Sequence, residues 1–256
     1  MRLLLHACCG PCSLEPIRLL RATGREPVVF YANSNIHPVE EYRHRLSTLR
    51  SWAEGEDVAV IEGTYDPSTW EEAVKRVGAT SPIRCPSSAA EGNPAAATER
   101  KERCRACYRL RFREAAAYAA ANGYDTLGTT LSVSPYQFTD VIREELEDAA
   151  RQAGIQALFE DYRPYYDEAT RRSREGGMYR QNYCGCRFSK VEAADERAAR
   201  KRQRDEDRAA KRAARDQERA GQEALRTAKQ EERRAYAAKQ AEKHAILKAL
   251  RERKGE

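Results

Sequence analysis

The sequence predicts an α/β protein with a doubly wound, mostly parallel sheet. Short apolar runs alternate with amphipathic segments of helical length along residues 2–162. Parallel strands need a crossover between them, usually a helix, so this alternation favours a parallel sheet with helices on its faces. A second observation is the composition beyond Lys190, where large apolar residues become rare. We therefore expect an α/β domain over residues 1–190 and a charged tail over residues 191–256.

The first half of the domain supplies three strands, each followed by a helix. We expect strands over residues 2–9, 27–35 and 57–63, and helices over residues 13–24, 39–55 and 68–78. The strands are short and apolar, whereas the helical segments repeat their apolar residues at helical spacing. Ser13 and Gly24 are typical of the start and the end of the first helix.

The second half continues the alternation after an interruption. Residues 86–99 are rich in Ala, Pro and Ser, which predicts a flexible insertion. The elements expected after it are a helix over 100–123, a strand and loop over 124–135, a helix over 136–154 and a strand over 155–162. Residues 163–189 read as a loop with short helical pieces.

The tail has a high helix propensity but only a thin apolar face, so it predicts a long solvated helix or a partly disordered arm. It lacks the sustained apolar heptads of a coiled coil. Residues 195–256 hold 20 Lys and Arg against 13 Asp and Glu, and the whole chain has a net charge of +6. The positive charge therefore belongs to the tail, and the α/β domain is nearly neutral.

No membrane partner is expected, because the sequence has no run of about 18 consecutive apolar residues. The apolar stretch at the start is too short for a secretory signal. A domain of roughly 190 residues buries a core without needing disulfides. We expect a cytoplasmic protein.

Eight cysteines in such a chain need an explanation. In a reducing compartment, clustered cysteines are more often metal ligands or catalytic thiols than structural disulfides. Seven of them form three groups, namely Cys8, Cys9 and Cys12, then Cys104 and Cys107, and finally Cys184 and Cys186. Cys85 stands alone, and we interpret it as incidental.

Two of these groups suggest a metal site. Cys104 and Cys107 have the C-x-x-C spacing that lets two thiolates reach one metal from the first turn of a helix, as in zinc sites, iron–sulfur sites and redox dithiols. The adjacent Cys8 and Cys9 must project from an irregular backbone, which suits a loop around a cluster or two neighbouring metal sites. Two thiolates from each group make the four that hold a [4Fe–4S] cluster, with a four-sulfur zinc site as the alternative.

Cys184 and Cys186 suggest redox chemistry. A disulfide across C-x-C closes a very small ring that is strained and easily reduced, and Gly185 gives the backbone the necessary freedom. Such a pair suits reversible two-electron chemistry, although both residues could be two further metal ligands. Cys12 could bind a second metal, serve as a spare cluster ligand or cap the helix start.

Polar side chains follow several strands at the sheet edge where open α/β sheets place their ligands. The candidates to face a substrate in this crevice are His6, Asn33, Asn35, His37, Thr129, Thr130 and Ser134. His6 could donate a proton or only satisfy a backbone carbonyl. Because no phosphate-binding glycine loop is present, a nucleotide-driven mechanism is not supported.

Five sequence blocks together resemble the cobalamin-independent epoxyqueuosine reductases of the QueH type. The blocks are "LLLHACCGPCS", "FYANSNIHPVEEYRHR", "RCRACYRLRF", "TTLSVSPYQ" and "MYRQNYCGCRFS", in this order between residues 2 and 190. Ser34 stands where the resemblance leads us to expect proline. The segment 86–99 and the tail lie outside the resemblance.

The resemblance implies a reductase that converts epoxyqueuosine to queuosine at the wobble position of tRNA. The epoxide oxygen leaves as water, and the reaction consumes two electrons and two protons. The resemblance also implies a [4Fe–4S] cluster on Cys8, Cys9, Cys104 and Cys107, together with a redox-active disulfide between Cys184 and Cys186. The implied fold is similar to the nucleotide-hydrolase-like, Rossmann-like tRNA enzymes. An additional iron, held partly by Cys12, is a further hypothesis.

The partners implied are tRNA carrying epoxyqueuosine and an external electron donor. The flipped-out wobble base is expected to stack on an aromatic side chain. The candidates for this are Tyr31, Tyr136, Tyr179 and Tyr183. The basic tail could add RNA affinity or be no more than a solvated helix. The rival functions are a tRNA sulfur-transferase and a non-enzymatic, zinc-stabilised RNA-binding module.

Overall fold

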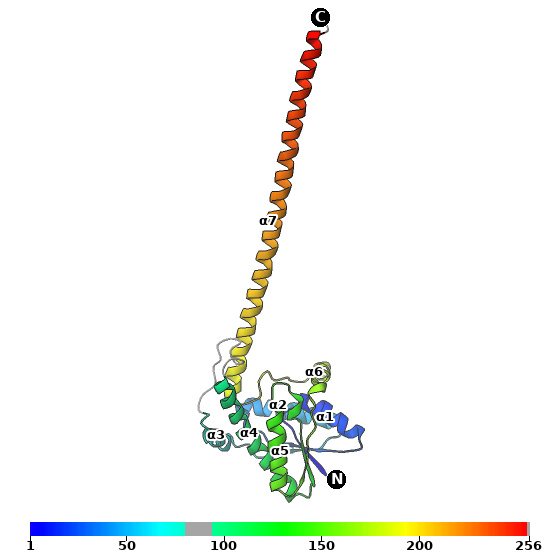
Figure 1. Ribbon diagram of the computed structural model, residues 1–256. Helices are drawn as coiled ribbons and strands as arrows, with labels where there is room; N and C mark the ends of the chain where they lie inside the picture. Colours follow the sequence, from blue (N-terminus) through cyan, green and yellow to red (C-terminus); the bar gives the residue numbers. More distant parts are fainter. Residues whose placement is uncertain (80–93, 255–256) are drawn as a thin grey trace. The chain divides into compact units, whose positions relative to one another are not determined.

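The computed structural model describes residues 1–79 and 94–254 (Figure 1). Its contacts divide the chain into two units, Met1–Ala199 and Arg200–Glu256, which we treat separately. We call the first unit the α/β domain. Cys85 and residues 86–93 of the predicted insertion lie outside the described residues.

The sheet has the predicted doubly wound topology. Its strands are β1 Leu3–His6, β2 Val28–Tyr31, β3 Val60–Glu62, β4 Thr126–Thr129 and β5 Gln156–Leu158, in the order β3-β2-β1-β4-β5. All four strand pairings are parallel. From β1 the chain first builds outward through β2 and β3, and then returns to add β4 and β5 on the other side. The order therefore reverses at β1 and β4, and such a reversal creates a ligand crevice at the carboxyl ends of the strands.

Helices cover both faces of the sheet, and for this reason the central strands β1 and β4 are buried on both faces instead of alternating between buried and exposed residues. Leu3 and Leu5 of β1 pack with helices α1 Gly10–Ala22 and α2 Val39–Gly55 on one face. Leu4 points to the opposite face and packs with α4 Pro94–Ala121 and α5 Thr139–Gln152. The other helices are α3 Pro67–Lys75, α6 Tyr166–Glu175 and α7 Arg187–Lys254, with short 3-10 turns at Leu131–Val133 and Arg163–Tyr165.

Two helices begin earlier than the sequence predicts. Helix α1 starts at Gly10 instead of Ser13, because Pro11 in its first turn supplies the backbone angle that a helix start needs. Cys12 therefore lies within the first turn. Helix α4 starts at Pro94, so residues 94–99 are helical and not part of a loop. The proline and the three alanines that follow it favour a helix start, a signal that the overall composition of this segment obscured.

The α/β domain extends beyond the expected boundary at Lys190. Phe188 is fully buried, and Glu192 is buried against the Arg103 guanidinium, with two hydrogen bonds of 2.7 and 2.8 Å. These two residues lie four positions apart and so share one face of α7. The first turns of α7 therefore belong to the domain, and composition alone placed the boundary too early.

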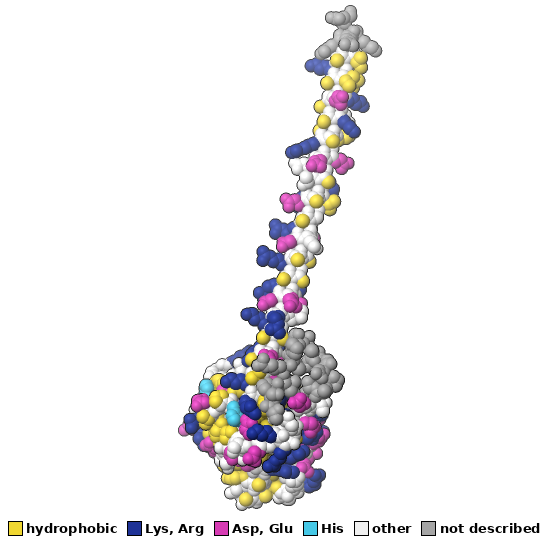
Figure 2. Space-filling view, turned by 90° about the vertical axis from the view of Figure 1, so that its left-hand side faces the viewer, with side chains coloured by type: hydrophobic (Ala, Val, Ile, Leu, Met, Phe, Trp, Pro, Cys, Tyr) yellow, Lys and Arg dark blue, Asp and Glu magenta, His cyan; other side chains and the backbone are white. Residues whose placement is uncertain are grey.

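The second unit is helical, so the prediction of a long solvated helix is confirmed over the described residues 200–254. Its side chains are largely exposed, including Leu225, Tyr236, Ile246 and Leu247. Figure 2 shows Lys and Arg side chains interspersed with acidic ones along this helix. Among the helices described, none has the length and apolarity required to cross a membrane.

Candidate functional site

Three thiols, which we call the N-terminal thiols, lie at the carboxyl end of β1. Cys8 and Cys9 follow the strand, and Cys12 lies in the first turn of α1. Their Sγ atoms all lie within 4.8 Å of one another, and those of Cys8 and Cys9 are 3.7 Å apart. Three sulfurs this close could contribute ligands to a metal centre.

The N-terminal thiols shift one another's pKa in opposite directions. Hydrogen bonds from the thiols of Cys12 and Cys9 hold the pKa of Cys8 well below its usual value, and the charges of Arg111 and Arg45 assist. Burial raises the pKa of Cys9 to about 12, and the hydrogen bond to Cys8 raises the pKa of Cys12. Because the thiolate is the form that binds metals, Cys8 is ready to act as a ligand.

The other four clustered cysteines, Cys104, Cys107, Cys184 and Cys186, form a second cluster. Cys104 and Cys107 lie one turn apart on α4, while Cys184 and Cys186 directly precede α7. Cys107 and Cys186 belong to one buried cluster, against which Cys184 packs. The Cys184 and Cys186 sulfurs are 3.8 Å apart and not bonded. Burial, and secondly the charge of Cys184, raises the pKa of Cys104 to about 12.

Two buried arginines interact with both cysteine clusters, the N-terminal thiols and the other four cysteines. The guanidinium of Arg111, on α4, acts electrostatically on both Cys8 and Cys107. That of Arg45, on α2, acts on Cys8 and Cys9 and donates a hydrogen bond of 3.0 Å to the carbonyl of Cys184. Cys104 also packs against the core cluster that contains Cys8 and Cys9. All three cysteine groups therefore border one region at the carboxyl end of the sheet.

Sequence reasoning missed these arginines, although a signal exists for Arg45. It lies on the helix face that also carries Tyr42, Leu46 and Leu49, and an arginine among apolar residues at helical spacing points inward. A third missed residue is Gln181, whose side-chain amide donates to Cys9 Sγ at 2.9 Å. Nothing in the sequence around Gln181 indicates that contact.

Gly185 is required where it stands between Cys184 and Cys186. Its φ of +127° lies in a region that L side chains rarely adopt. A Cβ atom there would also lie 2.9 Å from Ile36 and 3.2 Å from the side chains of Arg45 and Asn35. Any other residue at this position would therefore displace the two thiols.

His6 and Thr129 are hydrogen-bonded within the fold, and His6 contacts a backbone carbonyl, as one of its two interpretations predicts. His6 is fully buried, with Nδ1 3.2 Å from the Thr129 hydroxyl and Nε2 3.2 Å from the carbonyl of Ala32. Burial, together with Arg111, lowers the pKa of His6 to about 3. With both ring nitrogens occupied, the imidazole joins β1 to its neighbours and is not placed to donate a proton.

The other predicted polar residues differ in their surroundings. Asn35 Oδ1, His37 Nε2 and Thr130 Oγ1 are buried without a hydrogen-bond partner among the described residues. Ser134 accepts a hydrogen bond from the backbone of Tyr136, and Tyr183 donates one of 2.7 Å to the carbonyl of His37. Unpaired buried polar atoms are costly. Asn35, which lies against Gly185, and His37 are therefore the candidates to meet a bound ligand.

The sequence profile of a known family, described as Epoxyqueuosine reductase QueH, matches residues 3–192. The chain belongs to the QueH family. The match ends at Glu192, inside the part of α7 that belongs to the α/β domain.

Individual QueH proteins are similar over most of their length. The epoxyqueuosine reductase QueH of Dehalococcoides mccartyi is 30% identical over 75% of this chain and 93% of its own. That of Acinetobacter baylyi is 32% identical over 73% and 80%, respectively. That of Thermotoga maritima is 30% identical over 78% and 96%.

Proposed function

We propose that this chain reduces epoxyqueuosine to queuosine at the wobble position of tRNA. Membership of the QueH family and the activity for which its relatives are named support this function. The observation that carries the chemistry is the convergence of three cysteine groups at the carboxyl end of β1. A reductase needs such redox groups, and a ligand crevice is expected at this position of the fold.

The proposed cofactor is a [4Fe–4S] cluster held by Cys8, Cys9, Cys104 and Cys107. The donors suit such a group, since four thiolates are its usual ligands and the buried Arg45 and Arg111 offset their negative charge. The fully buried Trp70 packs with Cys107, and its indole N–H is a further donor for that sulfur. When bound, the cluster supplies electrons one at a time.

Cys184 and Cys186 are the proposed two-electron donor. The hydrogen bond from Cys186 lowers the pKa of Cys184 to about 5, and the Ser189 hydroxyl lies 3.0 Å from its sulfur. Oxidation of the Cys184 thiolate and the Cys186 thiol to a disulfide releases two electrons and one proton. The two electrons, this proton and a second proton from solvent convert the epoxide to an alkene, with the oxygen leaving as water. An external electron donor then reduces the disulfide.

An anaerobic assay tests this function. Protein purified without oxygen is incubated with tRNA containing epoxyqueuosine and a strong one-electron reductant, and the nucleosides are then analysed. We expect queuosine as the product and a brown protein that contains iron and sulfide. A colourless, zinc-loaded protein that binds tRNA without converting it would instead support the RNA-binding module.

Cys12 is proposed to hold an additional iron, because its sulfur completes the compact trio with Cys8 and Cys9. We expect Cys12→Ala to lose one iron per chain and to keep the cluster absorbance. The measurement is iron and sulfide content after anaerobic purification. Cys85→Ala, at the cysteine outside the three groups, is the matched control and should keep all the iron. An unsubstituted protein with no iron beyond the cluster would contradict the second site.

The basic tail is proposed to add affinity for tRNA through phosphate contacts. Removing residues 200–256 should weaken tRNA binding roughly tenfold, about the loss of one or two phosphate contacts, and should flatten its salt dependence. The cut follows Ala199, not Lys190, because Glu192 is buried in the α/β domain. Binding is measured over a salt series, and the rate at saturating tRNA should stay unchanged. Equal affinity and equal salt slopes would show that the tail is only a solvated helix.

A further inference from the structure

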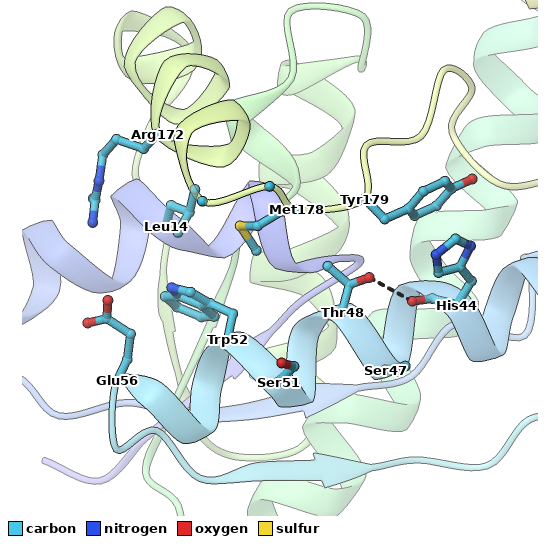
Figure 3. Close-up of a pocket in the computed structure, with 12 residues that line it drawn as sticks. Leu14, His44, Ser47, Thr48, Ser51, Trp52, Glu56, Arg172, Met178 and Tyr179 are labelled. Carbon is cyan, nitrogen blue, oxygen red and sulfur yellow. Dashed lines mark hydrogen bonds between the residues drawn. The ribbon is translucent and has the colours of Figure 1, made fainter.

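A cavity of about 710 Å³ lies in the α/β domain, between α1, α2 and the end of α6 (Figure 3). This volume is within the usual range for small-ligand sites. No cysteine lines the cavity, so it is distinct from the thiol region described above. None of the functions proposed above makes use of it.

The cavity and the thiol region share a wall. Met178 lines the cavity, and a Cβ atom added to Gly10, the residue after Cys9, would lie only 2.6 Å from Met178 Cε. Tyr179 also lines the cavity, and two residues later Gln181 donates to Cys9 Sγ. A ligand in the cavity therefore lies next to whatever occupies the thiol region.

Aromatic rings form part of the cavity wall. His44 stacks on Tyr179, with ring centroids 3.7 Å apart and an interplanar angle of 18°. The Tyr179 hydroxyl donates to Glu41 at 2.7 Å, which fixes the ring. Farther along α2, the half-buried Trp52 also faces the cavity, as Figure 3 shows. Such flat faces accept an unstacked base of single-stranded RNA, because every base has a π face.

Polar side chains form another part of the wall, and an arginine lies at one end. Ser47, Thr48 and Ser51 supply hydroxyl groups from α2. Arg172 lies at the end of the cavity near Trp52 and shares the fully buried carboxylate of Glu15 with Arg18.

Arg172 contacts Glu15 through one nitrogen, Nη1, and a guanidinium carries five N–H donors in all. Glu56, on the same rim, is itself paired with Arg21 at 3.9 Å. The end near Arg172 therefore suits a phosphate group, whereas the hydroxyl groups suit the edge of a base.

We infer that this cavity binds an unpaired nucleotide next to the wobble position of the anticodon loop. The wobble base itself cannot be the occupant, since its epoxide must reach the cysteines and none lines the cavity. Binding of a neighbouring base in the cavity fixes the position of the anticodon loop. The wobble nucleotide is thereby directed to the thiols on the other side of the shared wall. The inference rests on the proposed tRNA substrate.

A double-mutant cycle between protein and RNA tests this inference. An anticodon stem-loop RNA is compared with versions that lack the base at each nucleotide flanking the wobble position. We expect one abasic RNA to bind unsubstituted protein about tenfold more weakly, as the loss of one stacked base predicts. With Trp52→Ala, the intact RNA should bind more weakly and that abasic RNA should lose nothing further. Additive losses at every position would overturn the inference.

Further variants keep the test decisive if Trp52→Ala folds poorly. Ser51→Trp, at an exposed position, should fill the cavity and weaken binding, and Trp52→Phe should retain most of the affinity. Tyr165→Ala is the matched control, because Tyr165 is an exposed tyrosine that lies outside the cavity. If cavity variants leave RNA affinity intact and slow only the reduction by the electron donor, the cavity serves that donor and our inference is wrong.

The cycle also separates this inference from the proposed function. Conversion of epoxyqueuosine by the unsubstituted protein is measured in parallel at saturating tRNA. Conversion with additive binding losses would overturn only the nucleotide site. Absence of conversion with any tRNA would overturn the proposed function, whatever the cavity binds.

Discussion

Replacement of Cys184 by serine is expected to lower turnover of epoxyqueuosine-containing tRNA at least about a thousandfold, the scale on which loss of a directly reacting group acts. A serine hydroxyl cannot form a disulfide, so the variant cannot supply the two electrons that the dithiol supplies. The iron content and the visible absorbance should stay close to those of the unsubstituted protein, because Cys184 is not in the proposed ligand set. Both are measured on anaerobically purified protein, beside a single-turnover assay.

Two companion variants make this result interpretable. Cys186→Ser should behave as Cys184→Ser does, since the two sulfurs lie 3.8 Å apart and act as one unit. Cys107→Ser should instead lose iron, because Cys107 belongs to the proposed ligands. If Cys184→Ser or Cys186→Ser also loses iron, the pair belongs to the metal site and the dithiol proposal is wrong.

Arg103→Met is expected to lower the free energy of unfolding by about 3–5 kcal/mol, the usual cost of removing one partner from a buried ion pair. Arg103 and Glu192 are each less than 6% exposed and share two short hydrogen bonds. In the variant, Glu192 would lose its two closest guanidinium contacts, and the guanidinium of Arg100 lies farther away, at 3.9 Å. Denaturant unfolding under anaerobic conditions measures the loss.

A double variant and a surface variant serve as controls for Arg103→Met. Arg103→Met combined with Glu192→Met should recover much of the stability, because no charge is then left buried. Arg171→Met removes the partner of the exposed Glu168 and Glu175 and should leave the free energy of unfolding nearly unchanged. Equal losses for Arg103→Met and Arg171→Met would show that the buried pair contributes nothing particular.

Much of the fold could be predicted because its signals are local. The helix expected over residues 39–55 has those bounds in α2, since its apolar residues repeat at helical spacing between clear ends. Strands were predicted too long for the opposite reason. The strand expected over 27–35 leaves the sheet after Tyr31, where the Asn33 side chain hydrogen-bonds to Arg111 and to the carbonyl of Ala7 instead of the chain continuing the ladder.

The candidate site could be predicted only in part, because its geometry is not local. The spacing of the cysteines indicated which residues carry chemistry. It could not indicate that Cys107 packs with Cys186, nearly 80 positions away, while Cys12 lies with Cys8 and Cys9. That grouping depends on how α4 and the segment before α7 meet. Among the stacking candidates, Tyr31 is fully buried, which the sequence did not indicate.

The burial of His6 has a consequence for how the protein responds to acid. Since its pKa is about 3 in the fold and about 6.5 in an unfolded chain, this imidazole takes up a proton only when the domain opens. Between these two values, each unit of acidification shifts the balance toward the open chain by about 1.4 kcal/mol through this single group. The stability of the domain is thus sensitive to acid through a residue of the central strand, next to the thiols. The reaction rate near neutral pH, in contrast, does not depend on ionisation of His6.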